Sequence, residues 1–286
     1  MHDADRKVGA RDLSRACGHD ANGEWGVQLC GYPAVLDEGK LRVALLARDA
    51  PPVIMTDDRG AVTGSEIDLA RDLGKKLGVD IEFVRSAATY DGVVELIARK
   101  EADIAISFLS SNVRRAKKVL FSQPYVNQNQ KVFFNRARFA RMKRDYGIET
   151  IQEIATIPAV ETVEVGVLEG SVYEATLKED LPRLRPRLYQ GLPEMMAAVR
   201  AGEIFAGLHG QVQIEFYMRE QPDTAIYVDV EARERSPSDI SIAVRPDSPN
   251  LLRLVNIYLA NHVGLLRPQE VIERYRKARK VSGSRQ

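Results

Sequence analysis

Residues 41–84 read LRVALLARDAPPVIMTDDRGAVTGSEIDLARDLGKKLGVDIEFV, and this stretch sets the class of fold. Residues 41–47 form an apolar run of strand length, and TDDRG at 56–60 has the composition of a hairpin turn. Residues 65–78 predict an amphipathic helix with Gly78 as its C-cap, and residues 80–84 predict the next strand. The apolar face of this helix comprises Ile67, Leu69, Ala70, Leu73 and Leu77.

The alternation of strands and helices continues through the rest of the chain. A helix at 90–100 and a strand at 102–107 complete a first series, and a second series begins near Thr162. Because such repeats bury a parallel sheet between helices, we expect an α/β fold. The remaining predicted elements are strands at 162–168, 185–190 and 204–209, helices at 171–181, 192–203 and 211–220, a strand and a long helix within 239–263, and a last helix at 267–280.

The composition is that of an ordinary soluble globular protein. Hydrophobic residues make up 44% and charged residues 28% of the 286 residues, and 41 basic residues against 40 acidic ones leave a net charge of +1. This balance argues against binding to nucleic acid or to a membrane surface, since both favour a basic excess. No apolar stretch approaches the roughly 18 residues that a membrane-spanning helix needs.

The N-terminus, MHDADRKVGARDLSRAC, is polar and lacks the apolar segment of a secretory signal. Three interpretations stay open: a signal already removed, a domain cut from a longer protein, or a cytosolic protein. Residues 1–40 show no sustained period and predict an irregular leader.

Cys17 and Cys30 are the only cysteines, and we expect a disulfide between them. The bridge would close a short loop, worth about 3 kcal/mol in the chain-entropy account, and would indicate an oxidising compartment. Two unlinked thiols are the alternative. A zinc site is not expected, because His19 is the only nearby imidazole. The sequence also lacks a phosphate-cradling glycine loop and a Ser/His/Asp arrangement, so we expect no cofactor and no catalytic centre.

Five motifs in order resemble the periplasmic solute-binding proteins of amino-acid ABC transporters, whose fold is shared with the ligand-binding domains of ionotropic glutamate receptors. The motifs span roughly residues 40–280. They are the opening stretch at 41–79, YDGVVELIARKEADIAIS (90–107), SSNVRRAKKVLFSQPY (110–125), VGVLEGSVYEATLKE (165–179) and ISIAVRPDSPNLLRLVN (240–256).

The resemblance implies a type II periplasmic-binding fold with two lobes, each a mainly parallel sheet flanked by helices, and two hinge strands. It places lobe one at 41–132 and 238–286, and lobe two at 133–237. The hinges are expected near Gln130–Phe134 and within Val230–Asp239. A monomer is implied.

The family's carboxylate grip falls on Arg115, whose planar guanidinium matches a carboxylate's two oxygens. Ser110 and Ser107 align with further contacts beside it, and Tyr90 aligns with an aromatic wall of the pocket. In lobe two, Gly170, Ser171 and Val172 open a helix whose free N–H groups favour an anion. Each residue also has a structural interpretation: Arg115 lies in a basic run typical of a solvated face, Ser110 and Ser171 are suitable helix caps, and Tyr90 suits a core.

The departures from the family bear on the ligand. Gly210 stands where an acidic residue usually holds the ligand's ammonium group, Ala50 and Val53 flank the Pro-Pro turn where aromatic residues are common, and Asn112 replaces a threonine. A buried ammonium without a partner would cost several kcal/mol. We therefore expect a small carboxylate without an α-amine, or a pocket in which His209 or Gln211 supplies the missing contact.

The resemblance implies extracytoplasmic binding by lobe closure and delivery to a membrane permease. A sensor or regulatory domain fused to a membrane protein is one alternative. A cyclohexadienyl-dehydratase-like enzyme is another, with Glu169 as its only candidate acid. The stretch between Asn135 and Val160 is longer than the family leads us to expect, and residues 136–147 within it predict either a solvated surface or a docking surface for a partner. Their five basic residues are Arg136, Arg138, Arg141, Lys143 and Arg144.

Overall fold

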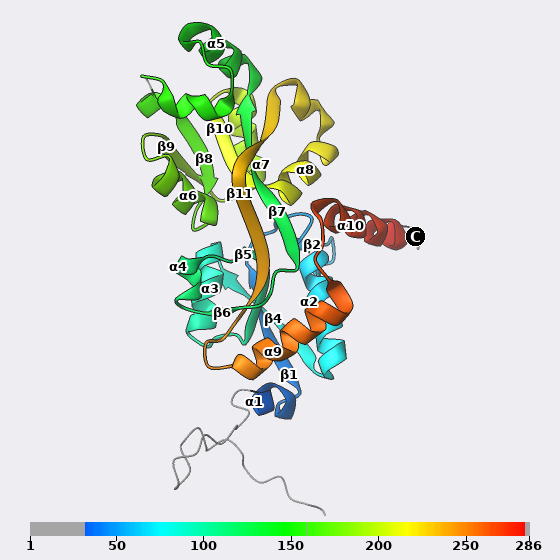
Figure 1. The fold of residues 1–286 in the computed structure, drawn as a ribbon. Coiled ribbons are helices and arrows are strands. Elements are labelled where there is room, and N and C mark those ends of the chain that lie inside the picture. The colour runs from blue at the N-terminus through cyan, green and yellow to red at the C-terminus, as the bar shows by residue number, and fades with distance from the viewer. Residues whose placement is uncertain (1–31, 159, 284–286) are drawn as a thin grey trace, which may run out of the picture.

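The computed structural model describes residues 32–158 and 160–283 and arranges them as two lobes, one above the other in Figure 1. Lobe one, the lower half, is built on β1 (Lys40–Leu46), β4 (Asp80–Ala87) and β5 (Ile104–Ser110). Lobe two, the upper half, is built on β8 (Glu164–Leu168), β9 (Arg185–Tyr189) and β10 (Ala206–Gly210). The predicted α/β class and two-lobed fold are confirmed.

Within each lobe the strands that alternate with helices are parallel. β1 pairs with β4 and β5 in lobe one, and β8 pairs with β9 and β10 in lobe two. Helices cover these strands and bury their apolar faces. In lobe one the helices are α2 (Ser65–Leu77), α3 (Tyr90–Ala98), α4 (Val113–Ala116) and α9 (Pro249–Tyr258), and in lobe two they are α5 (Arg136–Tyr146), α6 (Val172–Asp180), α7 (Leu192–Ala201) and α8 (Gln211–Glu220). The short elements are the hairpin strands β2 (Met55–Thr56) and β3 (Val62–Thr63), β6 (Leu120–Phe121), 3₁₀ turns at Ile151–Thr156, Val160–Thr162 and Pro222–Ile226, and a π turn at Leu259–Val263.

Two long strands join the lobes. β7 (Val126–Asn135) and β11 (Val228–Val244) pair with each other antiparallel and run from one lobe into the other (Figure 1). The sheet therefore continues through both lobes in the order β4-β1-β5-β11-β7-β10-β8-β9. The β7–β11 register shifts between Ala232 and Pro237, within the stretch predicted as the second hinge. The lobe boundaries given above remain predictions.

Helix α2 shows why this local sequence forms a helix. Acidic side chains in its first turn and Lys75 and Lys76 in its last turn complement the helix dipole. The helix stops at Gly78, whose left-handed backbone (φ +71°) favours glycine. Ile67, Ala70 and Leu73 are buried as predicted, but Leu69 and Leu77 are only partly buried, and Glu66 is buried although it is acidic.

The two ends of the described chain differ from the predictions. Residues 32–37 form helix α1 (Tyr32–Asp37), so the prediction of an irregular leader over 1–40 is wrong for this part. Val35 gives the physical reason, because its side chain is buried in the core of lobe one. The last helix, α10 (Pro268–Gly283), is longer than predicted and contacts both α8 of lobe two and α2 of lobe one. Cys17, Cys30 and His19 lie outside the described residues.

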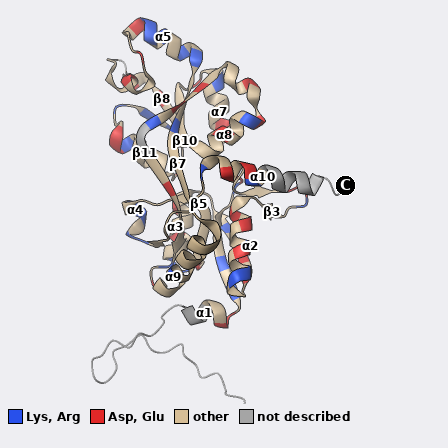
Figure 2. Cartoon of the chain, turned by 45° about the vertical axis from the view of Figure 1, so that its right-hand side comes forward, with Lys and Arg blue, Asp and Glu red and all other residues tan. Residues whose placement is uncertain are grey.

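The basic segment 136–147 comprises helix α5 and its C-cap Gly147. The helix lies at the far end of lobe two and buries none of its residues (Figure 2). Arg136 lies 3.6 Å from Asp229, and Lys143 lies 2.9 Å from Glu149. Arg138 packs over the ring of Phe205. These local contacts account for three of the five basic residues, and Arg144 also lies 3.7 Å from the neighbouring Asp145.

Candidate functional site

A small cavity lies between the lobes, where several strands end and helices begin. Arg115 enters it from the turn after β5, Ser171 from the start of α6, and Gln213 from the first turn of α8. Ligands of open α/β sheets sit in this position, beyond the carboxyl ends of strands. The cavity is lined by Tyr90, Phe108, Ser110, Arg115, Gln128, Ser171, Val172, Tyr173, His209 and Gln213.

Arg115 is buried at this interlobe position, with 2% of its surface exposed. Asn112 caps helix α4 by accepting a hydrogen bond from the Arg115 backbone N–H at 2.9 Å. The guanidinium donates through Nη1 to the Ser110 carbonyl at 2.9 Å and through Nη2 to the Gly170 carbonyl at 3.3 Å. Burial lowers the pKa of Arg115 below its usual value, although Asp91 opposes this effect. The side chain thus lies between the lobes and away from the outer surface.

Asp91 holds the third nitrogen of this guanidinium. Its carboxylate accepts from Arg115 Nε at 2.9 Å and also pairs with Arg114 at 2.8 Å. Burial alone would raise the pKa of Asp91, but the hydrogen bonds from Arg114 and Arg115 outweigh it and lower the pKa. Asp91 therefore stays ionised and fixes the plane of the Arg115 guanidinium.

Gly170 brings lobe two against the start of α3 in lobe one. Its carbonyl accepts from the backbone N–H of Asp91 at 3.0 Å as well as from Arg115. The residue has φ +63°, and an added Cβ would lie 2.7 Å from Cβ of Thr89. Only glycine combines this backbone conformation with so close an approach. The next residue, Ser171, caps α6 by accepting from the Glu174 N–H at 3.3 Å.

Lobe two contributes an imidazole that is neutral at physiological pH. Burial lowers the pKa of His209 to about 4. Its Nδ1 accepts a hydrogen bond from the Gly210 N–H at 2.8 Å, so the remaining proton lies on Nε2. The ring stands 5.3 Å from the ring of Tyr173. His209 is therefore a neutral contact and offers no charge to a ligand.

The side-chain oxygen of Gln213 is a hydrogen-bond acceptor to which no described residue donates. The residue is 4% exposed, and its Oε1 is buried with no partner among the described residues. Gln128 on the hinge strand β7 differs, because its Oε1 already accepts from the Val212 N–H at 3.1 Å. A buried carbonyl oxygen left without a donor costs about 1–3 kcal/mol, so a ligand N–H or O–H directed at Gln213 would be favoured.

Phe108 has the most unusual backbone of the site. It has φ +52°, a conformation that bulky residues rarely adopt. Its N–H donates to Glu66 Oε2 at 2.7 Å, and the same oxygen accepts from the Tyr125 hydroxyl. Burial raises the pKa of Glu66 to about 7, even though both hydrogen bonds lower it. Glu66 thus holds the strained turn that places Phe108 against the cavity.

Most residues expected in the site line this cavity: Arg115, Ser110, Tyr90, Ser171, Val172 and His209. Gly170 adjoins it through the contact with Arg115. Ser107 and Val53 lie elsewhere: Ser107 accepts from the Leu46 N–H at 2.9 Å, and Val53 is part of the core of lobe one. Gly210 is tightly packed, because an added Cβ would lie 2.7 Å from the Tyr173 hydroxyl.

Sequence reasoning missed Phe108, Gln128, Tyr173, Gln213 and the pairing of Asp91 with Arg115. The only signal for Gln128 and Gln213 was that both lie in segments already singled out, next to the first hinge and after the fifth strand of lobe two. Gln211, one of the two residues expected to replace the missing acid, bonds to Glu215 at 2.7 Å instead. Glu169 is exposed and accepts from Gln190 at 2.6 Å, and it does not line the cavity.

The cavity has a volume of only about 10 Å³, roughly the space of one water molecule. An organic ligand therefore needs the lobes to separate or side chains to move. Among residues 32–158 and 160–283, no group of three or more His, Cys, Asp or Glu side chains is placed to hold a metal ion. None of the helices described has the length and apolarity that a membrane crossing demands.

Comparison with known proteins finds relatives in sequence and in structure. The L-cystine-binding protein TcyJ of Escherichia coli (strain K12) is 27% identical over 226 residues, which cover 79% of this chain and 78% of TcyJ. The arginine-binding periplasmic protein of Mannheimia haemolytica is 26% identical over 164 residues, covering 57% of this chain and 60% of that protein. The crystal structure of the ancestral amino acid-binding protein AncCDT-1, a precursor of cyclohexadienyl dehydratase, superposes with a TM-score of 0.68 at 26% identity over 85% of this chain and 97% of AncCDT-1.

A family model gives the assignment directly. Residues 41–263, well over half of the chain, match the model of bacterial extracellular solute-binding proteins, family 3. The match confirms the resemblance seen in the five motifs, and the two lobes around an interlobe cavity fit it. The chain therefore belongs to the bacterial extracellular solute-binding proteins, family 3.

Proposed function

We propose that the protein binds a small carboxylate-bearing solute between its lobes, outside the cytoplasm, and delivers it to a membrane permease. One observation carries the proposal: the residues that line the interlobe cavity include a buried guanidinium, Arg115, and no carboxylate. A cavity with one fixed positive charge and no negative wall favours a monoanion.

The contacts of Arg115 indicate how the anion would be held. Asp91 accepts from Nε, and Nη1 and Nη2 donate to backbone carbonyls. The carbonyl that accepts from Nη2 is that of Gly170, in the opposite lobe. When the lobes separate, the bond to Gly170 breaks and Nη2 becomes free for a ligand carboxylate. The start of α6 then approaches from lobe two and adds the helix-terminal N–H groups around Ser171.

Lobe closure would follow from contacts that a ligand makes in the closed form alone. A ligand shifts the open–closed equilibrium only by the free energy of such differential contacts. Arg115 and Ser110 belong to lobe one, whereas Ser171 and Gln213 belong to lobe two, so an anion that touches both sets stabilises closure. Delivery to a permease is what membership of the family supports.

The second polar group of the solute would be a neutral hydrogen-bond donor. Gln213 offers an acceptor oxygen, His209 is neutral, and Gly210 places no charge beside them. An α-ammonium would be buried without a counter-ion among the cavity residues, at a cost of several kcal/mol. A 2-hydroxy acid or an unsubstituted short carboxylate fits these groups better than an amino acid does. The names of TcyJ and AncCDT-1 refer to cystine and amino-acid binding, so amino acids are the ligands with which hydroxy acids should be compared.

Calorimetry with matched ligand pairs tests the proposal. We expect lactate or glycolate to bind more tightly than alanine or glycine, and Arg115→Met to weaken lactate binding by about 3 kcal/mol, roughly a hundredfold in Kd. Arg114→Met is the matched control, because Arg114 also pairs with Asp91 but lies on the surface. Equal binding by Arg115→Met and the native protein would refute the carboxylate grip, and tighter binding of alanine would refute the neutral donor.

The enzyme alternative has no support in the geometry. A dehydratase-like reaction needs an acid–base carboxylate in the cleft, and Glu169 is exposed outside the cavity lining. A sensor domain would use the same ligand site, so calorimetry does not separate it from a transport component. Binding of the closed protein to a permease in liposomes, measured with and without ligand, would do so.

A further inference from the structure

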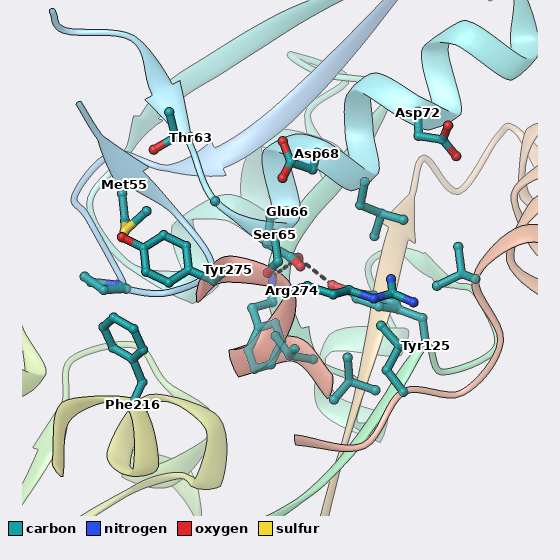
Figure 3. Close-up of a pocket in the computed structure, with 18 of the residues that line it drawn as sticks. Met55, Thr63, Ser65, Glu66, Asp68, Asp72, Tyr125, Phe216, Arg274 and Tyr275 are labelled. Carbon is teal, nitrogen blue, oxygen red and sulfur yellow. Dashed lines mark hydrogen bonds between the residues drawn. The ribbon is translucent and has the colours of Figure 1, made fainter. Parts of the chain in front are cut away.

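A second and much larger cavity lies beside the first. Its volume is about 1310 Å³, above the usual range of roughly 300–1,000 Å³ for small-molecule sites. Its wall combines α2 and the β2–β3 hairpin of lobe one, α8 of lobe two, and the C-terminal helix α10 (Figure 3). Phe108 lines both cavities and stands between them.

The charge of this larger cavity is opposite to that of the Arg115 cavity. Six acidic residues line it, against the guanidiniums of Arg59 and Arg274 and the imidazole of His262. Asp68 and Asp72 project from α2 in Figure 3. The acidic residues of the wall are Asp57, Asp58, Glu66, Asp68, Asp72 and Glu220.

Two buried polar groups on the same wall have no cationic partner among the described residues. Glu66 is 1% exposed, and its carboxyl oxygen Oε2 accepts from the Tyr125 hydroxyl and the Phe108 N–H, neither of which is a cation. The hydroxyl of Ser65 is buried and has no hydrogen-bond partner among the described residues. A cationic N–H donor in the cavity would meet both an acceptor hydroxyl and a negative field.

Aromatic rings form the other side of the cavity. Phe216 of α8 and Tyr275 of α10 meet edge to face with their centroids 5.3 Å apart, and Figure 3 shows both rings facing the space below the hairpin. The faces of aromatic rings attract organic cations. Tyr258 adds a third ring and donates its hydroxyl to Asp72 at 2.8 Å.

The protein already places cations of its own here, and Arg274 is one of them. Arg274 extends from α10 into the cavity (Figure 3), and its charge lowers the pKa of Tyr258, although burial and the Asp72 contact raise that pKa overall. The wall thus accommodates a guanidinium near the Tyr258 hydroxyl, which itself donates to Asp72. Because Arg274 is on an exposed part of the last helix, its side chain is free to give way to a ligand.

We propose that this cavity binds an organic monocation with an aromatic or apolar body, at a site separate from the Arg115 cavity. The carboxylates of α2 would hold the ammonium group, and the rings of Phe216 and Tyr275 would hold the body. Since the wall belongs to both lobes and to α10, an occupant would contact both lobes at once.

The experiment uses the full chain and 2-phenylethylamine as the probe, with 2-phenylethanol as its neutral partner. Calorimetry should give a Kd below about 1 mM for the amine and no measurable binding of the alcohol. Asp68→Asn combined with Asp72→Asn should weaken amine binding at least about tenfold, whereas Asp80→Asn, an exposed acid of lobe one outside the cavity, should leave it unchanged. Arg274→Ala removes the competing cation and should tighten it.

Several results would overturn the site. These are equal binding of amine and alcohol, an unaltered Kd in the double Asn variant, weaker binding after Arg274→Ala, or binding of spermidine in place of the aromatic amine. Arg115→Met separates this site from the carboxylate site, because it should weaken lactate binding roughly a hundredfold and leave the Kd of the amine unchanged. Loss of both together would refute the separateness of the two sites.

Discussion

The guanidinium of Arg115 in lobe one and the carbonyl of Gly170 in lobe two are joined by a hydrogen bond of 3.3 Å. The same oxygen accepts from the backbone N–H of Asp91 at 3.0 Å. One backbone carbonyl of lobe two therefore binds two donors of lobe one. The turn before α6 must come this close for the lobes to close. Any side chain at position 170 would prevent this approach, because its Cβ would collide with Thr89.

Gly170→Ala should therefore weaken closure. The left-handed backbone costs alanine about 1–2 kcal/mol, and the new Cβ would lie 2.7 Å from Thr89. Gly147→Ala is the matched control, since Gly147 has φ +69° but no atom within 4 Å of its added Cβ. We expect both variants to lose similar stability, while only Gly170→Ala shows a larger radius of gyration and at least tenfold weaker lactate binding. Identical scattering curves for the two variants would contradict the role given to Gly170.

Glu66→Gln should change how stability depends on pH. The pKa of Glu66 is raised by burial from 4.5 to about 7, so the folded protein binds this proton more tightly than the unfolded chain does. The contribution of Glu66 is present below pH 4.5 and is lost as the pH rises through 7, with a total on the order of 3 kcal/mol. Urea unfolding between pH 5 and 8 should show a smaller decline for Glu66→Gln than for the native protein. Glu101→Gln, an exposed substitution on the same lobe, should follow the native curve.

His209→Gln should act in the opposite direction. Burial lowers the pKa of His209 from 6.5 to about 4, so the unfolded chain binds this proton more readily. Its contribution is present above pH 6.5 and is lost as the pH falls toward 4. Between pH 4.5 and 6.5 this effect opposes that of Glu66, and the native curve should be flatter than either variant's. A native curve steeper than both variant curves would show that the two pKa shifts are misassigned.

Gln213→Met should separate stability from binding. It removes the buried Oε1 that has no partner among the described residues, so the free energy of unfolding should rise by about 1–2 kcal/mol. The same change removes the acceptor for a ligand hydroxyl, so lactate binding should weaken about tenfold while propionate binding changes little. Gln211→Met is the control on the same helix, because Gln211 bonds to Glu215 and lies outside the cavity lining. Equal losses for lactate and propionate would rule out a contact between Gln213 and the hydroxyl.

Local patterns were sufficient to predict most of the fold. Alternating apolar runs and Gly78 at the end of α2 placed the strands and helices within a few residues, because both depend on neighbours in the sequence. Helix α1 was missed because its main support is tertiary: Val35 packs into a core formed by distant strands. The length of β11 was missed for a similar reason. The charged run before Pro237 has no strand pattern of its own and is extended because it belongs to a strand that pairs with β7, far away in the sequence.

The site was predictable where a motif fixes a side chain, and less so where distant residues meet. Arg115 follows from SSNVRRAKK, but its partner Asp91 is 24 residues away and the Gly170 carbonyl is 55 residues away. Gln213 lies on a helix that was predicted correctly, yet the burial of its amide depends on how α8 packs against the opposite lobe. The helical pattern of the sequence places Glu66 on the polar face of α2, yet the residue is buried, with Phe108 and Tyr125 donating hydrogen bonds to it.

The shift in pairing between Ala232 and Pro237 has a consequence for the direction of ligand entry. Bending inside this gap breaks no ladder hydrogen bond, whereas bending on either side of it would break pairs of β7 and β11. The lobes should therefore rotate about a narrow axis at these strands, and their separation should grow with distance from it. In the sheet β5 separates β1 from β11, and β10 and β8 separate β9 from β7, so the contact between Arg48 and Gln190, which follow β1 and β9, lies away from that axis. Solutes would thus enter past Arg48, along the edge of the molecule that opens widest.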